Sequence, residues 1–431
     1  MKIGIGSATA CAAVLAGALL SGCSGDDGGV SADGTVRIVF WHGQTQIAQK
    51  ALDGLVAEFN RTHPKIKVVS QSGGSTADQL LPKVTAALVS GSYPDISYIY
   101  GSDLASIARN RKVADLTSAV QAPGVDWNDF WPAARAAATV DGRVRAIPAL
   151  TDNLAVIYNK KLFAEQKVAP PKPGWSWDDF RATAKALTDP SKGTYGTAWP
   201  IADGEDVTWR LWPLVWQQGG DIVTPDRRRS RFAGPEGVRG LTVWRDMSVA
   251  DKSVYLDQDS AGARMGQLFN NGKMGMFVAG PWALADIGPA KIDYAVAPLP
   301  GFNGDNTTIG GPDNWVVMDK GSERRKAATE FLLWLTRPAQ DLRWDLATGQ
   351  LPLRASASRH PSYAAYQARW KLDVWIDNLP KMRTRPTLRA YPKLSQAVQE
   401  AIAAVLLGKM EPGPALDRAA KAADSALATE E

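Results

Sequence analysis

Cysteine is nearly absent from this chain of 431 residues. Its two cysteines, Cys11 and Cys23, lie within the first 23 residues, so the stretch from residue 24 onward contains none. A body without cysteine has no disulfide, no thiolate nucleophile and no cysteine-ligated metal. At about 150 residues per domain, a body of this length forms two or three domains and buries large cores without cross-links.

Further absences narrow the class of function. No stretch after Leu20 is long and apolar enough to span a membrane. The histidines His42, His63 and His360 are too scattered for a metal site, and neither a G-x-S-x-G nor a P-loop motif is present. The net charge of +5 is spread along the chain, and its densest basic cluster, residues 227–231, lies in a turn typical of a solvated loop. We therefore expect no metal, no cofactor and no nucleic-acid partner.

The first 23 residues form a secretory signal that ends in a lipidation motif. Lys2 supplies a positive charge, residues 8–20 an apolar core, and Leu20-Ser21-Gly22-Cys23 a small-residue cleavage site. The last four residues resemble the bacterial lipobox, in which the cysteine is acylated, with palmitate for example, and becomes the first mature residue. Several acyl chains anchor a protein stably. We expect a signal peptide over 1–22, lipidation of Cys23 and an extracytoplasmic protein anchored to the cell membrane; an ordinary signal peptide is the alternative.

The region after Cys23 predicts a flexible tether followed by an α/β domain. Residues 24–34 (SGDDGGVSADG) have nothing to bury. Strands are then expected at 35–41, 65–69 and 95–100, alternating with helices at 46–60, 80–89 and 104–110. This alternation predicts a largely parallel sheet. Ligands bind such sheets beyond the carboxyl ends of the strands, here at residues 42–44, 73–76 and 101–103.

The rest of the chain carries shorter strands and then mainly helices. Strands are expected at 153–158, 275–278, 294–298 and 314–318, and helices at 179–187, 207–218, 263–269, 323–335, 339–348, 362–373, 394–407 and 414–429. Asp178 is the expected N-cap of the helix over 179–187. The helix over 207–218 carries Trp209, Trp212 and Trp216 on one face. We expect two of these tryptophans in the core, while Trp209 could instead face a cleft.

Several separated motifs follow one another in a characteristic order. They are Val39-Phe40-Trp41-His42-Gly43, Tyr93-Pro94-Asp95-Ile96, Asp141-Gly142-Arg143, Ile157-Tyr158-Asn159-Lys160-Lys161-Leu162-Phe163, Asn271-Gly272-Lys273-Met274-Gly275-Met276, Gly280-Pro281-Trp282, Gly349-Gln350-Leu351-Pro352 and Leu407-Gly408-Lys409. In this order and spacing, over nearly the whole mature chain, they resemble the extracellular solute-binding proteins of carbohydrate ABC importers, which include maltose-binding protein.

The resemblance implies a two-lobed periplasmic-binding-protein fold of type II, with three crossovers near residues 148–152, 298–302 and 335–338. Lobe one would comprise residues 35–148 and 302–336, and lobe two residues 149–301 and 337–431, after a lipidated tether over 23–34. It also implies a binding protein and not an enzyme. Such a protein, expected to be a monomer, captures a mono- to oligosaccharide between its lobes and delivers it to permease subunits served by a cytoplasmic ATPase.

A sugar site needs hydrogen-bonding groups for vicinal hydroxyls and an aromatic face beneath the ring. Candidates at the strand ends of lobe one are His42, Gln44, Ser75, Tyr100, Ser102 and Asp103; a helix cap is the equal alternative for Asp103. By the resemblance, Asp152 is the acidic sugar ligand and Trp282 the stacking tryptophan, with a turn aspartate and core packing as their alternatives. Further candidates are Asp206, Trp209, Gly311, Asn314, Arg389 and Tyr391. The family's late stacking aromatic corresponds to Ser395, which leaves the number of sugar subsites open.

Two other functions compete with sugar binding. A binder of glycerol 3-phosphate or a glycerophosphodiester, from the same superfamily, fits Phe40-Trp41-His42, Ile309-Gly310-Gly311 and Arg389 as a phosphate partner. No cluster of basic residues at the strand ends supports it. An exported glycoside hydrolase needs two carboxylates about 5–9 Å apart across a cleft. Asp103 and Asp152 are candidates, but no motif assigns one as acid and the other as base.

Overall fold

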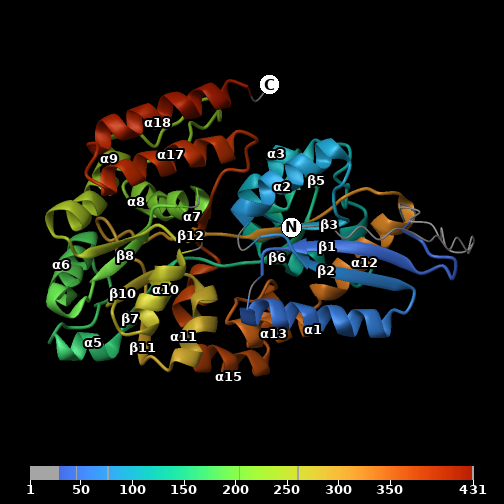
Figure 1. Ribbon diagram of the computed structural model, residues 1–431, viewed down its shortest axis with the longest axis horizontal. Helices are drawn as coiled ribbons and strands as arrows, with labels where there is room; N and C mark the ends of the chain where they lie inside the picture. The colour runs from blue at the N-terminus through green and yellow to red at the C-terminus, as the bar shows by residue number, and fades with distance from the viewer. Residues whose placement is uncertain (1–28, 45, 75–76, 203, 260–261, 430–431) are drawn as a thin grey trace, which may run out of the picture.

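The computed structural model describes residues 29–44, 46–74, 77–202, 204–259 and 262–429, and these form two lobes that lie side by side (Figure 1). Cys23 and Ser75 therefore lie outside the described residues. No helix within the described ranges is long and apolar enough to cross a membrane.

The first lobe is built on a five-stranded sheet with the strand order β2-β1-β3-β13-β6. Its elements are β1 (Val36–His42), α1 (Gln46–Thr62), β2 (Ile66–Ser72), α2 (Ala77–Ser90), β3 (Ile96–Tyr100), η1 (Gly101–Asp103), α3 (Leu104–Ala108), η2 (Ala119–Gln121), η3 (Trp127–Asp129), α4 (Pro132–Ala137), β4 (Thr139–Val140), β5 (Arg143–Val144) and β6 (Ile147–Leu150), joined later by β13 (Asp313–Val317) and α12 (Ser322–Leu335). β1, β2 and β3 run parallel, so their carboxyl ends meet at one edge; β13 runs antiparallel between β3 and β6.

Helices cover both faces of this sheet, which explains why its strands are so apolar. Phe40 of β1 points toward α1 and α12, where its ring meets Phe331 edge-on with centroids 5.5 Å apart. Ile99 of β3 and Val316 of β13 point to the other face and pack with Val84 of α2. Each fully buried side chain of this size contributes about 1.5–3 kcal/mol to stability.

The second lobe contains the sheet β10-β7-β11, in which both neighbours of β7 are antiparallel to it. Its elements are β7 (Ala155–Asn159), α5 (Lys160–Glu165), α6 (Trp177–Leu187), η4 (Pro190–Lys192), β8 (Thr197–Pro200), α7 (Gly204–Thr208), η5 (Trp209–Leu211), α8 (Trp212–Trp216), α9 (Pro235–Arg245), η6 (Asp246–Ala250), β9 (Val254–Asp257), α10 (Ala263–Asn270), β10 (Met276–Ala279), η8 (Pro281–Ala283), α11 (Leu284–Ala290), β11 (Tyr294–Ala297), β12 (Ile309–Gly310), α14 (Ala355–Ser358), α15 (Pro361–Trp370), α16 (Asp373–Asn378), β14 (Arg383–Thr384), α17 (Tyr391–Leu406) and α18 (Pro412–Leu427). Helix α13 (Pro338–Thr348) packs against α1, and its Trp344 belongs to the core of the first lobe. The sheet β10-β7-β11 thus differs from the first lobe, where the parallel pairing predicted from residues 35–110 is found among β1, β2 and β3. β10 and β11 flank β7 and are connected in the chain through α11. β7, which the chain enters from the first lobe, runs in the direction opposite to both.

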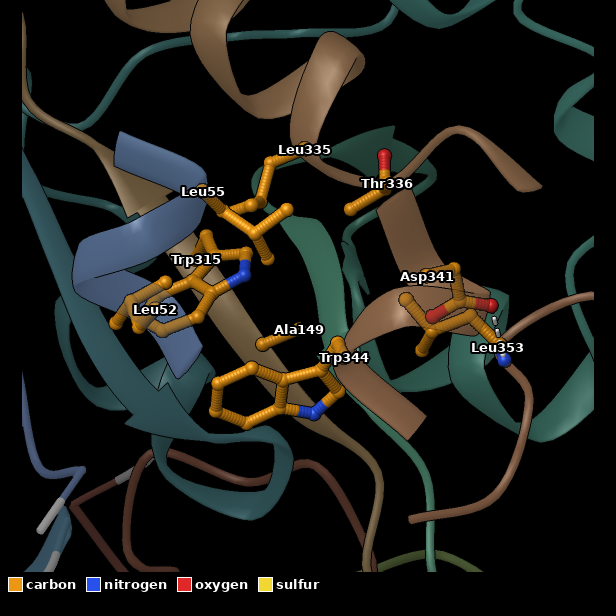
Figure 2. A pocket seen from close by; sticks show the side chains of 9 residues that line it. All are labelled: Leu52, Leu55, Ala149, Trp315, Leu335, Thr336, Asp341, Trp344 and Leu353. Carbon is orange, nitrogen blue, oxygen red and sulfur yellow. Dashed lines mark hydrogen bonds between the residues drawn. The ribbon is translucent and has the colours of Figure 1, made fainter. Parts of the chain in front are cut away.

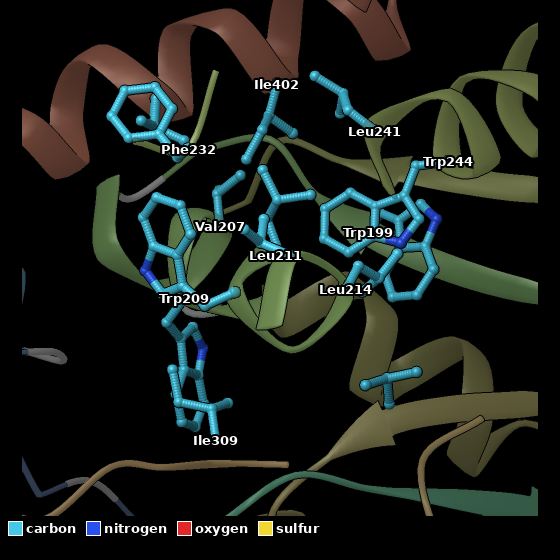
Figure 3. Packing of buried hydrophobic residues seen from close by; sticks show 14 of the residues in the cluster. Trp199, Val207, Trp209, Leu211, Leu214, Phe232, Leu241, Trp244, Ile309 and Ile402 are labelled. Atoms are coloured by element: carbon cyan, nitrogen blue, oxygen red, sulfur yellow. The ribbon is translucent and has the colours of Figure 1, made fainter. Parts of the chain in front are cut away.

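A tryptophan-rich core holds the second lobe together (Figure 3). Trp199 and Trp244 stack with ring centroids 4.5 Å apart. Trp212 and Trp216 are buried in the same core, and the indole N–H of Trp212 donates to the Tyr391 hydroxyl over 2.9 Å. The expectation that at least two of the three clustered tryptophans serve the core is confirmed.

Two local expectations need correction. Ser176, and not Asp178, caps α6: its hydroxyl accepts from the Asp179 N–H, and the Asp179 carboxylate accepts from the Ser176 N–H, which completes a capping box. The helix expected over 207–218 is a succession of α7, η5 and α8. Pro213 lies in the first turn of α8, where its missing N–H costs nothing.

Residues 29–34 do not form the free linker expected from their composition. Val30 forms an antiparallel bridge with Val36, and the Arg37 N–H donates to the Gly29 carbonyl over 2.7 Å. The Asp33 carboxylate accepts from the Thr35 N–H over 3.0 Å. Local side-chain bonds therefore fold this segment back onto β1, although it buries little apolar surface.

Strand pairing and core membership show where the chain passes between the lobes. Leu150 belongs to the core of the first lobe and Leu154 to that of the second, as expected for a crossing at 148–152. Ile309 still packs in the second lobe and β12 pairs with β14, so we place the second crossing at 311–312 and not at 298–302. The lobe boundaries expected from the sequence otherwise stay predictions.

Candidate functional site

The strand ends of the first lobe meet the second lobe around Gly311. The Gly311 N–H donates to the Asp152 carbonyl over 3.1 Å. A Cβ atom on residue 311 would lie 2.5 Å from Asp152 Oδ1 and 3.0 Å from the six-membered ring of Trp209. Glycine is therefore needed here because the Asp152 carboxyl group and the Trp209 indole approach its backbone from two sides.

A second tryptophan extends this aromatic surface. The rings of Trp209 and Trp282 have centroids 5.8 Å apart and planes inclined by 35°. Trp282 begins the short helix η8 after β10 and folds back over Gly280, where a Cβ atom would lie 1.8 Å from its ring. Trp209 is 6 % exposed, whereas Trp282 is half-buried. Two indoles from different elements thus adjoin each other, and one of them, Trp209, lies near the Asp152 carboxyl group.

A buried ion pair lies beneath the same surface. Arg385 Nη1 donates to Glu205 Oε1 over 2.8 Å, and both side chains are at least 95 % buried. Glu205 also accepts from the hydroxyls of Tyr391 and Ser395, both on α17. The Arg385 guanidinium lies 5.4 Å from the ring of Trp209 and 5.7 Å from that of Tyr100, at the end of β3. It therefore contacts aromatic rings from both lobes.

Two carboxyl groups of this region have raised pKa values. Burial raises the pKa of Asp313 to about 7, and it outweighs the hydrogen bond that Asp313 accepts from the Tyr98 hydroxyl. Burial, followed by the charge of Asp313, raises the pKa of Asp152 well above its usual range. One oxygen of each, Oδ1, is buried without a hydrogen-bond partner among the described residues. Such oxygens can accept hydrogen bonds from a bound molecule.

Five of the residues expected in the site come together here: Tyr100, Asp152, Trp209, Trp282 and Gly311. Tyr391 is connected to this group through Glu205, because its hydroxyl donates to the Glu205 carboxylate. Asp206 is at the margin, where it accepts from Arg210 over 2.9 Å. Ser102 and Asp103 follow β3 in η1 and are buried; Asp103 occupies the N-cap position of α3 without a side-chain cap bond.

The other candidates are placed elsewhere. His42 is fully buried on the α1 side of the sheet, where one ring nitrogen contacts the Ser70 hydroxyl and the other accepts from the Gln44 N–H. Burial lowers its pKa. The Asn314 amide donates to the Ala137 carbonyl, and the Arg389 guanidinium to the Thr429 carbonyl on the surface.

The site residues predicted from the sequence do not include Glu205, Asp313 or Arg385. Arg385 lies four residues before the candidate Arg389, and Asp313 lies next to the candidate Asn314. Alternation along β13 carries a usable signal, because Asn314 must face away from its neighbour Asp313. Glu205 has no such signal, since its role depends on contacts with a helix about 190 residues later.

Two hollows lie outside this region. The smaller, of about 20 Å³, separates α1 from α13 and is lined by apolar side chains and Asp341 (Figure 2). The larger, of about 470 Å³, lies between α11, α13 and α15. Among the described residues, no group of three or more histidine, cysteine, aspartate or glutamate side chains is placed to hold a metal ion.

Comparison with known proteins gives consistent relatives. The family model for bacterial extracellular solute-binding proteins matches residues 42–341. The sn-glycerol-3-phosphate-binding periplasmic protein of Yersinia pseudotuberculosis is 26% identical over 415 residues, covering 91% of this chain and 92% of the relative. An uncharacterised lipoprotein of Streptomyces antibioticus is 28% identical over 404 residues, covering 88% of this chain and 84% of the relative.

A solved structure agrees with the fold over its full length. The cyclic α-maltosyl-1,6-maltose binding protein of Arthrobacter globiformis has a TM-score of 0.75 and 25% sequence identity, and the match covers 92% of this chain and 100% of that one. The family model matches residues 42–341, which is more than half of the chain, and the chain therefore belongs to the bacterial extracellular solute-binding protein family.

Proposed function

We propose that this protein is the substrate-binding subunit of an ABC importer and that it holds a carbohydrate where its lobes meet. One observation carries the proposal: the Trp209 indole approaches the carboxyl group of Asp152 across Gly311, and the Trp282 indole adjoins that of Trp209. Indole faces stack on the C–H faces of sugar rings, and carboxyl oxygens accept from vicinal hydroxyls. The sugar named for the Arthrobacter relative supports the same class of ligand.

Lobe closure is the step that we infer links binding to transport. Tyr100 belongs to the first lobe, whereas Trp209 and Arg385 belong to the second. A sugar held among them contacts both lobes and stabilises the closed form by its higher affinity for that form. The closed form then docks on the permease subunits, which the cytoplasmic ATPase drives.

We further propose that Cys23 is lipidated and that the monomer works at the outer side of the cell membrane. The lipobox-like sequence and the lipoprotein name of the Streptomyces relative support this placement. Radiolabelled palmitate should enter the protein when it is expressed in its host, and a Cys23→Ala variant should remain unlabelled. Labelling of that variant would contradict the proposal.

Glycerol 3-phosphate or a glycerophosphodiester is the second candidate ligand, favoured by the name of the Yersinia relative and by the buried Arg385. The guanidinium of Arg385 is already paired with Glu205, and further carboxyl groups surround it. A phosphate must compete with these anions, so we rank this ligand below a sugar.

A thermal-shift screen tests the proposal, followed by calorimetric titration of whichever ligand stabilises the protein. The screen contains mono-, di- and oligosaccharides, glycerol 3-phosphate and glycerophosphocholine. A ligand that binds only the folded protein raises Tm as its concentration increases. Trp282→Ala should weaken sugar binding at least tenfold. Trp370→Ala, which removes a half-buried tryptophan at the larger hollow, should leave it unchanged.

Stabilisation by glycerol phosphates alone would select the second candidate, and stabilisation by none would contradict the sugar proposal. The same sugars test whether the protein is an enzyme. We expect no turnover of an aryl-glycoside panel, because the proposed role of Asp152 is to accept hydrogen bonds from a bound ligand. Product release from any member of that panel would contradict this expectation.

A further inference from the structure

Carboxyl groups outnumber cationic groups around the candidate site. Two arginines lie there, and each is already paired with one carboxylate. Arg385 lies 2.8 Å from Glu205, and Arg210 lies 2.9 Å from Asp206. These pairs neutralise themselves, since each contributes one positive and one negative charge.

Asp152 and Asp313 are left without a cation of their own. Their side chains are 7 % and 4 % exposed, and Oδ1 of each is buried with no hydrogen-bond partner among the described residues. Neither forms an ion pair with a described residue, and the second oxygen of Asp313 accepts from the neutral Tyr98 hydroxyl. The two carboxyl groups are close enough that the charge of Asp313 raises the pKa of Asp152.

The Asp152 carboxyl group lies near two tryptophan rings. Gly311 separates Asp152 from Trp209, whose ring adjoins that of Trp282. Two carboxylates beside two indole faces suit a positively charged nitrogen: ammonium donates up to three hydrogen bonds, and an indole face attracts a cation. A neutral hydroxyl supplies one donor, so it satisfies one of the two buried carboxyl oxygens and compensates no charge.

We infer that the ligand is a carbohydrate bearing a protonated amino group, which lies between the carboxyl groups of Asp152 and Asp313. This inference rests on the proposed function, since it specifies the class of sugar for the same site. The ammonium supplies a counter-ion that allows both carboxyl groups to ionise, while the rest of the sugar ring stacks on Trp282. A phosphate is negatively charged, unlike an ammonium group, and is therefore disfavoured next to the same two carboxyl oxygens.

Matched sugar pairs test the inference by calorimetric titration of the mature protein at pH 6.5. The pairs are glucose with glucosamine, galactose with galactosamine, and cellobiose with its diamino analogue, the β-1,4 dimer of glucosamine. N-acetylated versions supply the bulk of the nitrogen without its charge, and acarbose against maltotetraose provides an amine within an α-linked chain. In at least one pair the amine should bind at least tenfold more tightly than both neutral partners.

Two variants show whether Asp152 and Asp313 cause the preference. Asp152→Asn and Asp313→Asn should each reduce the ratio of the amine's affinity to the neutral sugar's affinity to within about threefold of one. A variant that unfolds is detected by its circular dichroism, and the other then decides. Asp417→Asn, an exposed carboxylate on α18, is the matched control and should retain the ratio.

The outcomes separate the two proposals. If neutral sugars bind as tightly as their amines, the inference is overturned and carbohydrate binding stands. If no sugar of either kind binds, the carbohydrate proposal fails and the inference fails with it. Tight binding of glycerophosphocholine but of no amino sugar would mean that the cation is a quaternary ammonium, and this too would overturn the inference.

Discussion

Arg385 and Glu205 form a hydrogen-bonded ion pair of 2.8 Å that is almost completely buried, although about 180 residues separate them in the chain. The pair stands at the meeting point of the lobes, since the guanidinium also faces the rings of Tyr100 and Trp209. Hydrogen bonds from Tyr391 and Ser395 hold Glu205 in place. The pair therefore positions the aromatic side chains around the candidate site.

Removing one partner of this pair should be costly. Arg385→Met leaves a buried carboxylate without its cation and should lower the free energy of unfolding by about 3–5 kcal/mol. The double variant Arg385→Met, Glu205→Gln should recover at least half of this loss, because no charge remains buried. Urea unfolding measures both. Arg143→Met, which removes an exposed partner of Asp115, should cost about 1 kcal/mol or less. Equal costs for the buried and exposed pairs would contradict this account.

Gly311→Ala should weaken ligand binding. The added methyl group meets Asp152 Oδ1 and the Trp209 ring, so one or both must move by several tenths of an ångström. We expect at least tenfold weaker binding of the ligand found by the screen. Gly54→Ala, in an open position within α1, is the control and should leave affinity unchanged while stabilising the protein by about 0.4–1 kcal/mol. Unchanged affinity in both variants would show that the contact at residue 311 has no role.

The burial of the Asp345 carboxyl group predicts that the free energy of unfolding falls as pH rises. Both of its carboxyl oxygens are buried and without partners among the described residues, and burial and the neighbouring Asp341 raise its pKa well above the usual value. Burial likewise raises the pKa of Asp341 to about 7. The folded state therefore binds these protons more tightly than the unfolded state, and their stabilisation is lost as pH rises from about 4 through 7.

The variant Asp345→Asn carries no titrating group at this position. The free energy of unfolding of the variant minus that of the unaltered protein should be at least about 1 kcal/mol larger at pH 8 than at pH 5. This difference is equivalent to roughly one pKa unit. Chemical denaturation at the two pH values measures the difference. Asp417→Asn should change stability equally at both. The same pH dependence in all three proteins would exclude Asp345 as its source.

Ser176→Ala should destabilise the start of α6. It removes the hydroxyl that accepts from the Asp179 N–H over 3.1 Å and should cost about 1 kcal/mol. Ser118 is a matched control, because it precedes the short helix η2 without a side-chain cap bond. Ser118→Ala should therefore be nearly neutral. Comparable losses from the two variants would show that the capping box contributes nothing specific.

Regular patterns along the chain predicted most of the helices and strands to within a few residues. The burial of Ile38 and Phe40 between more exposed neighbours, and the helical spacing of Leu52, Val56 and Phe59, reflect packing against a single partner surface. The direction of strands in the second lobe has no such local signature. It depends on where the chain enters from the first lobe.

The candidate site was only partly predictable for the same reason. Glycine, tryptophan and aspartate in short motifs pointed to Gly311, Trp282 and Asp152, which lie together. His42 shares the strand face of Phe40, and that face is directed at α1. Arg385 was missed because an arginine in an extended segment looks exposed until a buried partner such as Glu205 is known.

The folded-back segment at residues 29–34 has a mechanical consequence. From Cys23 to Gly29 there are six residue steps, which span at most about 20 Å when fully extended. If Cys23 is lipidated as proposed, a short segment that pairs with the start of β1 connects the first lobe to the membrane. Hinge motion then moves the second lobe, with Trp209 and Trp282, relative to a first lobe that stays close to the membrane.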